Sequence, residues 1–213
     1  MSTILVTGYE PFGEFETNPA RQLATALDGT RVAGATLVGR ELPVAFDRAR
    51  PALVEHIERH DPTLVVSLGL AAGRPALSLE RVGINLRDTA GTPDNDHRSV
   101  LDDPVDVGGP DAYFSTLPVR EMQTAMREAG VPTTLSTSAG THLCNDILYA
   151  TRRYVETNDL ETRSGFVHVP LSHEQAATRE TTQPSMALET MRRGIEVELK
   201  TALGIGLETA LEE

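Results

Sequence analysis

A short apolar run, Thr63–Leu68 (TLVVSL), limits the possible fold more than any other segment of the chain. An unbroken apolar run of this length predicts a strand that is buried on both faces, as is typical inside a parallel sheet. A glycine-rich loop, Gly69–Arg74, follows it. Open sheets of this kind bind ligands at the carboxyl ends of their strands. The run therefore predicts an α/β protein with a ligand site near this loop.

The rest of the chain alternates between strand and helix patterns. Asn18-Pro19 is typical of a helix start, with Asn as the cap and Pro at the first position, and we expect this helix to end at Leu27. Alternation predicts one domain over residues 1–213, a three-layer α/β/α sandwich with a mostly parallel mixed sheet. The other expected strands are Ser2–Thr7, Thr36–Val44, Ser78–Leu86, Pro132–Ser138 and Gly165–Pro170, and the other expected helices are Ala45–His60, Pro118–Ala129, Asn145–Glu156 and Ser185–Leu203. Arg87–Pro110, rich in Asp, Gly and Pro, is expected to be a long loop or a flap with short strands, and loops of this length are often functional.

Composition argues against several classes of protein. The chain has 31 acidic and 19 basic residues, a net charge of −12, and such a surface repels nucleic acid and anionic membranes. No apolar run approaches the length of a membrane span, and the N-terminus lacks the basic segment of a signal peptide, so we expect a cytoplasmic protein. Only one basic residue is a lysine, Lys200. Acid excess with arginine in place of lysine suggests a halophilic protein, with biased codon usage in a mildly acidic protein as the alternative.

The only cysteine, Cys144, lies in the segment Ser136–Tyr149 (STSAGTHLCNDILY). A single cysteine cannot form an internal disulfide or a multi-cysteine metal site. Small and hydroxylated residues precede Cys144 and an apolar helical pattern follows it, which predicts a thiol near a helix N-terminus. Free backbone N–H groups and the helix dipole favour a thiolate there. From this segment alone, a buried cysteine that only fills the core is the alternative.

Glu80 and His168 also lie in predicted strands close to turns. Glu80 shares a strand face with apolar residues, where a carboxylate is costly to bury unless it is paired. A thiol nucleophile needs an imidazole that takes up and returns its proton, and the imidazole gains from a carboxylate that orients it. Backbone N–H groups around Cys144 and Asn145 are candidates for an oxyanion hole. Because such triads are recognised in space, an ordinary surface or capping role for the histidine stays open.

The loop Gly8–Gly13 holds two aromatic residues, Tyr9 and Phe12, just after the first predicted strand. Two neighbouring aromatics at the end of a buried strand suggest a flat, apolar surface for a ligand. The alternative is that both rings simply pack onto the core.

Several blocks, in one order along nearly the whole chain, resemble a known family. The blocks TGYEPFG with NP six residues later, LGLAAGRPALSLERVGIN, TPDN, GGPDAYFSTLP, SAGTHLCNDILY and GFVHVPL are similar to those of the pyrrolidone-carboxylate peptidases. These are the type I pyroglutamyl peptidases, a cysteine peptidase family. The resemblance implies an omega-peptidase that removes an N-terminal pyroglutamyl residue through a thioester acyl-enzyme, with Glu80, Cys144 and His168 as its catalytic residues. It also implies a phosphorylase/hydrolase-like fold, no metal or organic cofactor, pyroglutamylated peptides as substrates, and a homotetramer.

By position, the resemblance assigns the substrate pocket to Tyr9, Phe12, Asn18, Leu70, His142 and Leu143. The chain departs from the family pattern close to this pocket. Phe is usual at Tyr9 and at His142, Gln at Leu70, Gly at Ala72, and an Arg often stands at Gly91. Two alternatives therefore stay open: a cysteine amidase of the same fold with a different acyl-group specificity, and a non-catalytic homologue that binds a lactam. A phosphorylase-like enzyme would need a phosphate site, for which Gly73-Arg74 is the only candidate.

Overall fold

The apolar run at residues 63–68 lies inside a sheet, as its composition predicts. In the computed structural model, which describes residues 2–204, β4 (Leu64–Leu70) is buried throughout. It lies between β1 (Thr3–Tyr9) and β9 (Arg163–Val169) and is parallel to both. The seven strands have the order β2-β3-β1-β4-β9-β5-β8, with β2 at Arg31–Val32, β3 at Ala35–Leu42, β5 at Leu77–Glu80 and β8 at Thr133–Ser136. Two of the pairings, β2 with β3 and β5 with β9, are antiparallel, so the sheet is mixed and mostly parallel.

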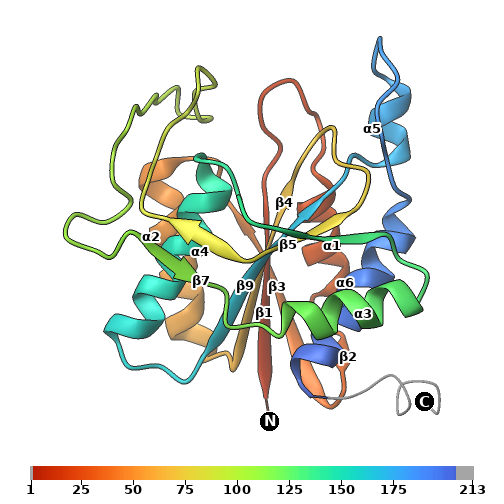
Figure 1. Cartoon of the computed structure of the whole chain (residues 1–213), viewed down its shortest axis with the longest axis horizontal. Helices are drawn as coiled ribbons and strands as arrows, with labels where there is room; N and C mark the ends of the chain where they lie inside the picture. Colours follow the sequence, from red (N-terminus) through yellow and green to blue (C-terminus); the bar gives the residue numbers. More distant parts are fainter. Residues whose placement is uncertain (1, 205–213) are drawn as a thin grey trace.

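Helices cover both faces of this sheet (Figure 1). Because side chains alternate along a strand, Ile4 and Val6 of β1 pack on one face while Leu5 packs on the other. The first face is covered by α1 (Pro19–Leu27), α3 (Val119–Glu128) and α6 (Leu188–Ala202), and the second by α2 (Phe46–His60) and α4 (Leu143–Thr157). This is the predicted three-layer α/β/α arrangement. No helix between residues 2 and 204 combines the length and the apolar character that a membrane crossing requires.

Two expectations about local structure were wrong, and one short helix was missed. The stretch Ser78–Leu86 is two strands, because β6 (Val82–Ile84) leaves the main sheet and pairs antiparallel with β7 (Ala112–Phe114). An alternation of apolar and polar residues predicts a strand but not the strand with which it pairs. The sequence around residue 81 therefore does not indicate that the stretch divides between two sheets. The helix expected from Asn145 begins two residues earlier, which places Cys144 within its first turn. A short helix, α5 (His173–Ala177), was not predicted.

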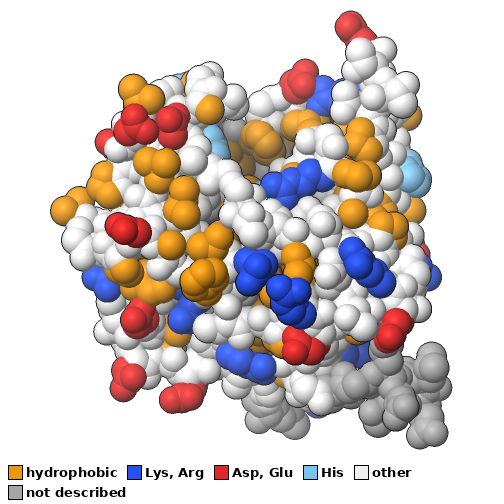
Figure 2. All heavy atoms as spheres, in the orientation of Figure 1, with side chains coloured by type: hydrophobic (Ala, Val, Ile, Leu, Met, Phe, Trp, Pro, Cys, Tyr) orange, Lys and Arg blue, Asp and Glu red, His pale blue; other side chains and the backbone are white. Residues whose placement is uncertain are grey.

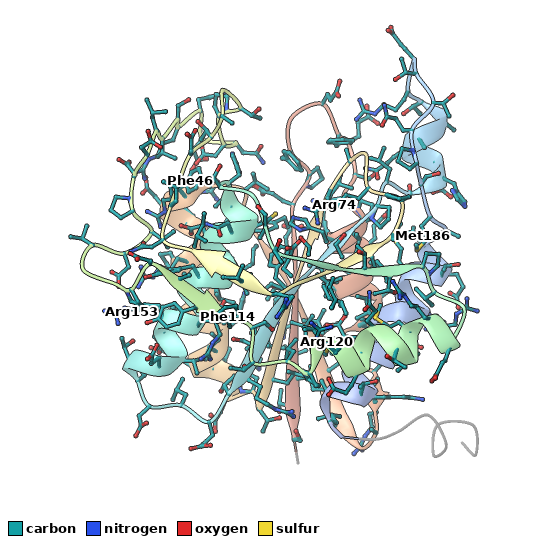
Figure 3. The ribbon with its side chains drawn as sticks, viewed as in Figure 1. Phe46, Arg74, Phe114, Arg120, Arg153 and Met186 are labelled. Carbon is teal, nitrogen blue, oxygen red and sulfur yellow. The ribbon has the colours of Figure 1, made fainter. Side chains whose placement is uncertain are left out.

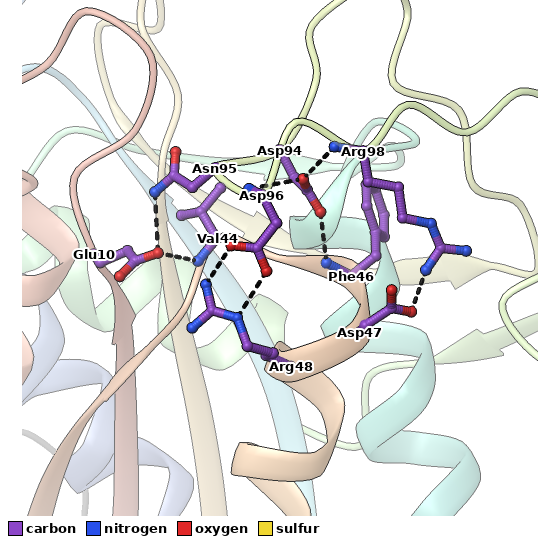
Figure 4. A network of polar contacts seen from close by, with 9 residues as sticks. All are labelled: Glu10, Val44, Phe46, Asp47, Arg48, Asp94, Asn95, Asp96 and Arg98. Atoms are coloured by element: carbon purple, nitrogen blue, oxygen red, sulfur yellow. Dashed lines mark hydrogen bonds and ion pairs between the residues drawn. The ribbon is translucent and has the colours of Figure 1, made fainter.

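Carboxylates anchor the long segment between β6 and β7 (Figure 4). Buried Asp94 accepts a hydrogen bond from the backbone N–H of Phe46, at 2.9 Å, and so caps α2, whose own N-cap residue has no side-chain hydrogen bond. Asn95 donates to Glu10 Oε1 at 3.0 Å, and the backbone N–H of Val44 donates to the same oxygen at 2.9 Å. The segment is therefore fixed to the first loop and to the start of α2.

Glu198 of α6 is a buried carboxyl without a hydrogen-bond partner in the part of the chain that the structure describes. Its side chain is fully buried, and neither carboxyl oxygen has a hydrogen-bond partner among the described residues. Burial raises the pKa of Glu198 from 4.5 to about 8. The folded protein therefore keeps a proton that the unfolded chain releases, and the free energy of unfolding falls as the pH rises through this interval.

We expect Glu198→Gln to raise the free energy of unfolding by roughly 1–3 kcal/mol at about pH 8, and by much less at about pH 5. The neutral amide removes the cost of either ionising or protonating the buried group. Urea unfolding at both pH values measures this difference, with the exposed Glu161→Gln as control. An equal effect of Glu198→Gln at both pH values would contradict the account.

Candidate active site

Three side chains from distant parts of the chain meet on the face of the sheet that α4 covers. Glu80 ends β5, and His168 lies near the end of the neighbouring strand β9. Glu80 Oε1 lies 2.7 Å from His168 Nδ1. Cys144 Sγ packs against Gly69, the residue of β4 that is paired with His168 in the sheet, and the sulfur raises the pKa of the His168 ring. Glu80 and His168 are buried, whereas Cys144 is partly exposed. The structure thus brings together all three residues that were predicted to be catalytic, in the order nucleophile, imidazole, carboxylate.

The charges in this cluster favour a protonated His168. Burial alone would lower the pKa of His168, but Cys144 and Glu80, through charge and hydrogen bonds, raise it to about 9. Burial alone would raise the pKa of Glu80, yet His168, Ser136 and Arg74 together lower it. At neutral pH the His168 ring is therefore protonated. A positively charged imidazole beside a thiol favours the nucleophilic thiolate form of such a group.

Cys144 packs directly against β4 because residue 69 is a glycine. A Cβ atom added at Gly69 would lie 2.8 Å from Cys144 Sγ and 2.7 Å from the ring of Phe166. Neither contact is sterically possible without movement of the thiol or of the ring. Gly69 was expected in the loop after β4, but it lies within the strand and makes room for the nucleophile.

The first turn of α4 presents free backbone N–H groups beside the thiol. Cys144 is the second residue of α4, and the N-cap residue, His142, makes no capping hydrogen bond with its side chain. The first N–H groups of a helix have no partner within it. They are therefore available to bind the oxyanion that forms on a carbonyl oxygen when the Cys144 sulfur attacks the carbonyl carbon, as an oxyanion hole requires.

The residues after Cys144 attach α4 to segments about 60 positions earlier in the chain. The side-chain amide of Asn145 accepts from the backbone N–H of Ile84 at 2.8 Å and donates to the carbonyl of Ile84 at 2.9 Å. Buried Asp146 forms an ion pair with Arg87. Burial raises the pKa of the Asp146 carboxyl, although Arg87 opposes this shift. Local sequence patterns give no indication of these contacts.

A small pocket of about 40 Å³ opens beside Cys144. Figure 2 shows this face of the molecule hollowed in its upper middle part, with apolar side chains inside the hollow. Mostly apolar walls with a few polar groups are typical of small-ligand sites. The pocket is lined by Tyr9, Phe12, Asn18, Val44, Leu70, His142, Leu143 and Cys144. All six residues assigned to the substrate pocket by resemblance lie here, together with Val44, which the resemblance did not include.

Two polar residues of the pocket wall already have hydrogen-bond partners within the protein. Asn18 caps α1, as predicted, through a 3.0 Å bond from the N–H of Ala20, and its amide donates to the carbonyl of Glu10 at 3.1 Å. The hydroxyl of Tyr9, which a Phe would lack, donates to the carbonyl of Leu143 at 2.6 Å. Both side chains therefore shape the pocket, and Tyr9 also holds the start of α4.

His142 gives the pocket a polar nitrogen where a Phe is usual in the family. Its Nε2 lies 3.1 Å from the carbonyl oxygen of Thr92, which can only accept, so Nε2 carries the hydrogen. Burial lowers the pKa of His142, so the ring is neutral near pH 7 and its Nδ1 is an acceptor. The ring also packs at a tilt on Phe46, with 5.1 Å between the ring centroids.

Within residues 2–204, no group of three or more His, Cys, Asp or Glu side chains is arranged to hold a metal ion. The candidate site therefore consists of the cysteine cluster and the small pocket beside it.

A mixed α/β sheet in which a thiol, an imidazole and a carboxylate meet beside a small apolar pocket has the arrangement of a cysteine hydrolase. The family model described as pyroglutamyl peptidase matches residues 2–204. The chain belongs to the pyroglutamyl peptidase family.

Individual relatives agree with this assignment. The chain is 43% identical to a pyrrolidone-carboxylate peptidase of Thermococcus onnurineus, with 94% of this chain and 98% of the relative covered. It is 43% identical to one from Cupriavidus necator, with 95% and 94% covered. A mutant pyrrolidone carboxyl peptidase of Pyrococcus furiosus matches the structure with a TM-score of 0.92 at 38% identity, covering 95% and 98% of the two chains. The enzyme from Thermococcus litoralis matches with a TM-score of 0.92 at 36% identity, covering 96% and 94%. The resemblance seen in the sequence and the predicted fold class are confirmed.

We expect iodoacetamide to alkylate Cys144 faster in the wild type than in His168→Ala at about pH 7, because a protonated imidazole beside a thiol favours the reactive thiolate. The reason is that His168 holds the proton. His168→Ala should slow alkylation at this pH by about tenfold or more. Mass spectrometry follows the reaction directly, because the chain has no other cysteine. The ion pair between Cys144 and His168 would be contradicted if the wild type and His168→Ala had the same pH profile of alkylation, with reaction only at alkaline pH.

Proposed function

We propose that this chain is a cysteine exopeptidase that hydrolyses the amide bond after an N-terminal pyroglutamyl residue, with Glu80, Cys144 and His168 as its catalytic residues. One observation carries the proposal: a single buried imidazole is hydrogen-bonded to a carboxylate through Nδ1 at 2.7 Å, and the only thiol of the chain packs against Gly69, the strand neighbour of that histidine. The small pocket beside that thiol and the names of the relatives support pyroglutamyl as the acyl group.

In the acylation step, the Cys144 sulfur attacks the pyroglutamyl carbonyl carbon. The carbon–sulfur bond forms, and the carbonyl oxygen becomes an oxyanion that the free N–H groups of the first turn of α4 stabilise. His168 donates its proton to the amide nitrogen, and the carbon–nitrogen bond breaks, which releases the shortened peptide. Glu80 holds the Nδ1–H form of the ring and stabilises its positive charge. The product on the enzyme is a thioester.

In the deacylation step, His168 takes a proton from a water molecule, and the water oxygen attacks the thioester carbonyl. The carbon–sulfur bond breaks, the sulfur leaves as a thiolate beside the protonated ring, and free pyroglutamate departs. Every proton and electron pair is accounted for by the three side chains and water, so these two steps call for no additional group.

The pocket residues would hold the lactam ring of the substrate. Phe12, Leu70 and Leu143 present apolar surface to the ring methylenes, and the aromatic part of Tyr9 extends this wall. Asn18 keeps the first loop in place through its bond to Glu10. His142 Nδ1, an acceptor in the neutral ring, is a candidate partner for a substrate N–H.

A cysteine amidase with a different acyl-group preference is the second candidate. The observations that favour it are the polar atoms of Tyr9 and His142, which occupy positions where the family usually has Phe. Hydrolysis rates of pyroglutamyl and prolyl amides, compared in the wild type and in His142→Phe, separate the two functions. Comparable turnover of the prolyl amide by the wild type would favour the second candidate.

We further propose a single peptidase domain over residues 1–213 that acts in a salt-rich cytoplasm as a homo-oligomer, a tetramer by family resemblance. The acid excess and the single lysine support the salt adaptation. Phe114 of the edge strand β7 is 68% exposed, and Val107 and Leu101 nearby along the chain are 87% and 75% exposed, which supports burial against another copy. Phe114 is labelled in Figure 3, on the surface beside β7.

The direct test is the hydrolysis of a pyroglutamyl reporter amide across a salt series. We expect thiol-reagent-sensitive turnover that rises with salt and falls by at least about a thousandfold in Cys144→Ser, because a serine hydroxyl is not ionised by the same imidazole. Binding of the reporter without turnover in the wild type, and with equal affinity in Cys144→Ser, would indicate a non-catalytic lactam-binding protein instead.

A further inference from the structure

Arg74 contacts the catalytic cluster from the loop that follows β4. Its Nη1 donates to Glu80 Oε1 at 2.6 Å, and its Nη2 donates to the backbone carbonyl of Ser138 at 3.2 Å. The Arg74 side chain is 33% exposed, whereas the Glu80 side chain is fully buried. Figure 3 shows Arg74 in the middle of the molecule, between the side that carries Phe46 and the side that carries Met186. One guanidinium thus joins the buried carboxylate to the loop that leads into the nucleophile helix.

Arg74 and His168 share one oxygen of the Glu80 carboxylate. His168 Nδ1 lies 2.7 Å from Oε1, the same atom that accepts from Arg74. The other oxygen, Oε2, is buried and has no partner that meets hydrogen-bond geometry among the described residues, although the Ser136 hydroxyl of β8 contributes to the lowered pKa of this carboxyl. Two cationic donors therefore determine both the ionisation and the direction of the carboxylate.

We propose that Arg74 is a positioning residue of the triad, which keeps Glu80 ionised and directed at His168 while it ties the Ser138 loop to the carboxylate. Arg74 does not touch the reacting atoms. This role rests on the proposed function, because its main readout is the pH profile of pyroglutamyl hydrolysis.

The pH dependence follows from the charged groups that face each member of the cluster. Glu80 is faced by His168 from β9, by Arg74 and by the Ser136 hydroxyl, and His168 is faced in turn by Glu80 and by Cys144 from α4. Without the guanidinium, Glu80 ionises at a higher pH, which moves the acid limb of the profile upward. The imidazolium, now the only cation on Oε1, also keeps its proton to a higher pH, so the alkaline limb moves in the same direction.

The test measures kcat and kcat/KM against pH for the wild type, Arg74→Met and Arg74→Lys. We expect Arg74→Met to move both limbs upward by about 0.5–1 pH unit and to lower kcat, with a smaller change in KM. Arg74→Lys keeps the charge, so its limbs should stay in place, while kcat falls because an ammonium cannot reproduce the planar fork that reaches both acceptors. The control is Arg59→Gln, which removes an exposed surface ion pair and should leave the profile unchanged.

Unmoved limbs in a folded Arg74→Met protein, whatever its thermal stability, would overturn the proposal and leave Arg74 a purely structural role. A wild type that does not hydrolyse the reporter would overturn the proposed function instead. In that case the pH profile of Cys144 alkylation tests Arg74 independently, because it reports the ion pair without substrate. The same upward shift in Arg74→Met would support the role of Arg74, and an unshifted profile would contradict it.

Discussion

The hydrogen bond between Glu80 and His168 is the interaction on which the rest of the site depends. A fully buried carboxylate is tolerated only when it is paired, and the bond to Nδ1 at 2.7 Å supplies the pair. The same bond fixes the hydrogen on Nδ1 and directs the other ring nitrogen toward Cys144. The antiparallel pairing of β5 with β9 places the two side chains on one face of the sheet. This pairing, the one that is antiparallel among the described strands from β3 to the edge strand β8, therefore brings Glu80 beside His168.

The surroundings of the cluster are held by polar contacts between loops rather than by the sheet. Asp94 caps α2, Asn145 binds the backbone of β6, and the Tyr9 hydroxyl holds the carbonyl of Leu143. Each contact satisfies a backbone group that would otherwise be costly to bury. Together they position the walls of the pocket relative to the thiol. A substitution in the long segment between β6 and β7 can therefore alter the pocket without touching it.

Local patterns in the sequence predicted most of the fold, because burial of a strand and capping of a helix depend on residues that are close together in the chain. Continuous apolar runs marked the buried strands, and Asn18-Pro19 marked the start of α1 with its cap. The pairing of β6 with β7 was missed, since alternation does not specify a partner strand. Arg74 was considered only with Gly73 as a candidate phosphate site, although its partner Glu80 is six residues away. Asp94 and Arg87 were not assigned roles because their contacts join segments that are distant in the chain. The types and the spacing of these residues do not indicate which partners they contact.

The location of the candidate site was predictable for a different reason. Glu80, Cys144 and His168 were selected by their chemistry and by family blocks, and the structure brings them into one cluster. The six pocket residues likewise lie around one cavity beside the thiol. Their roles in binding and catalysis stay predictions. The polar atoms of Tyr9 and His142 lie at positions where the resemblance leads us to expect Phe.

The central claim is that His168 carries the proton of the Cys144–His168 pair at neutral pH. NMR titration of the His168 imidazole, in protein with labelled histidine, measures this directly. We expect His168 to titrate with a pKa of about 9 in the wild type, and at a clearly lower pH in Cys144→Ser, where the sulfur charge is absent. A pKa near 6.5 that is the same in both proteins would contradict the account.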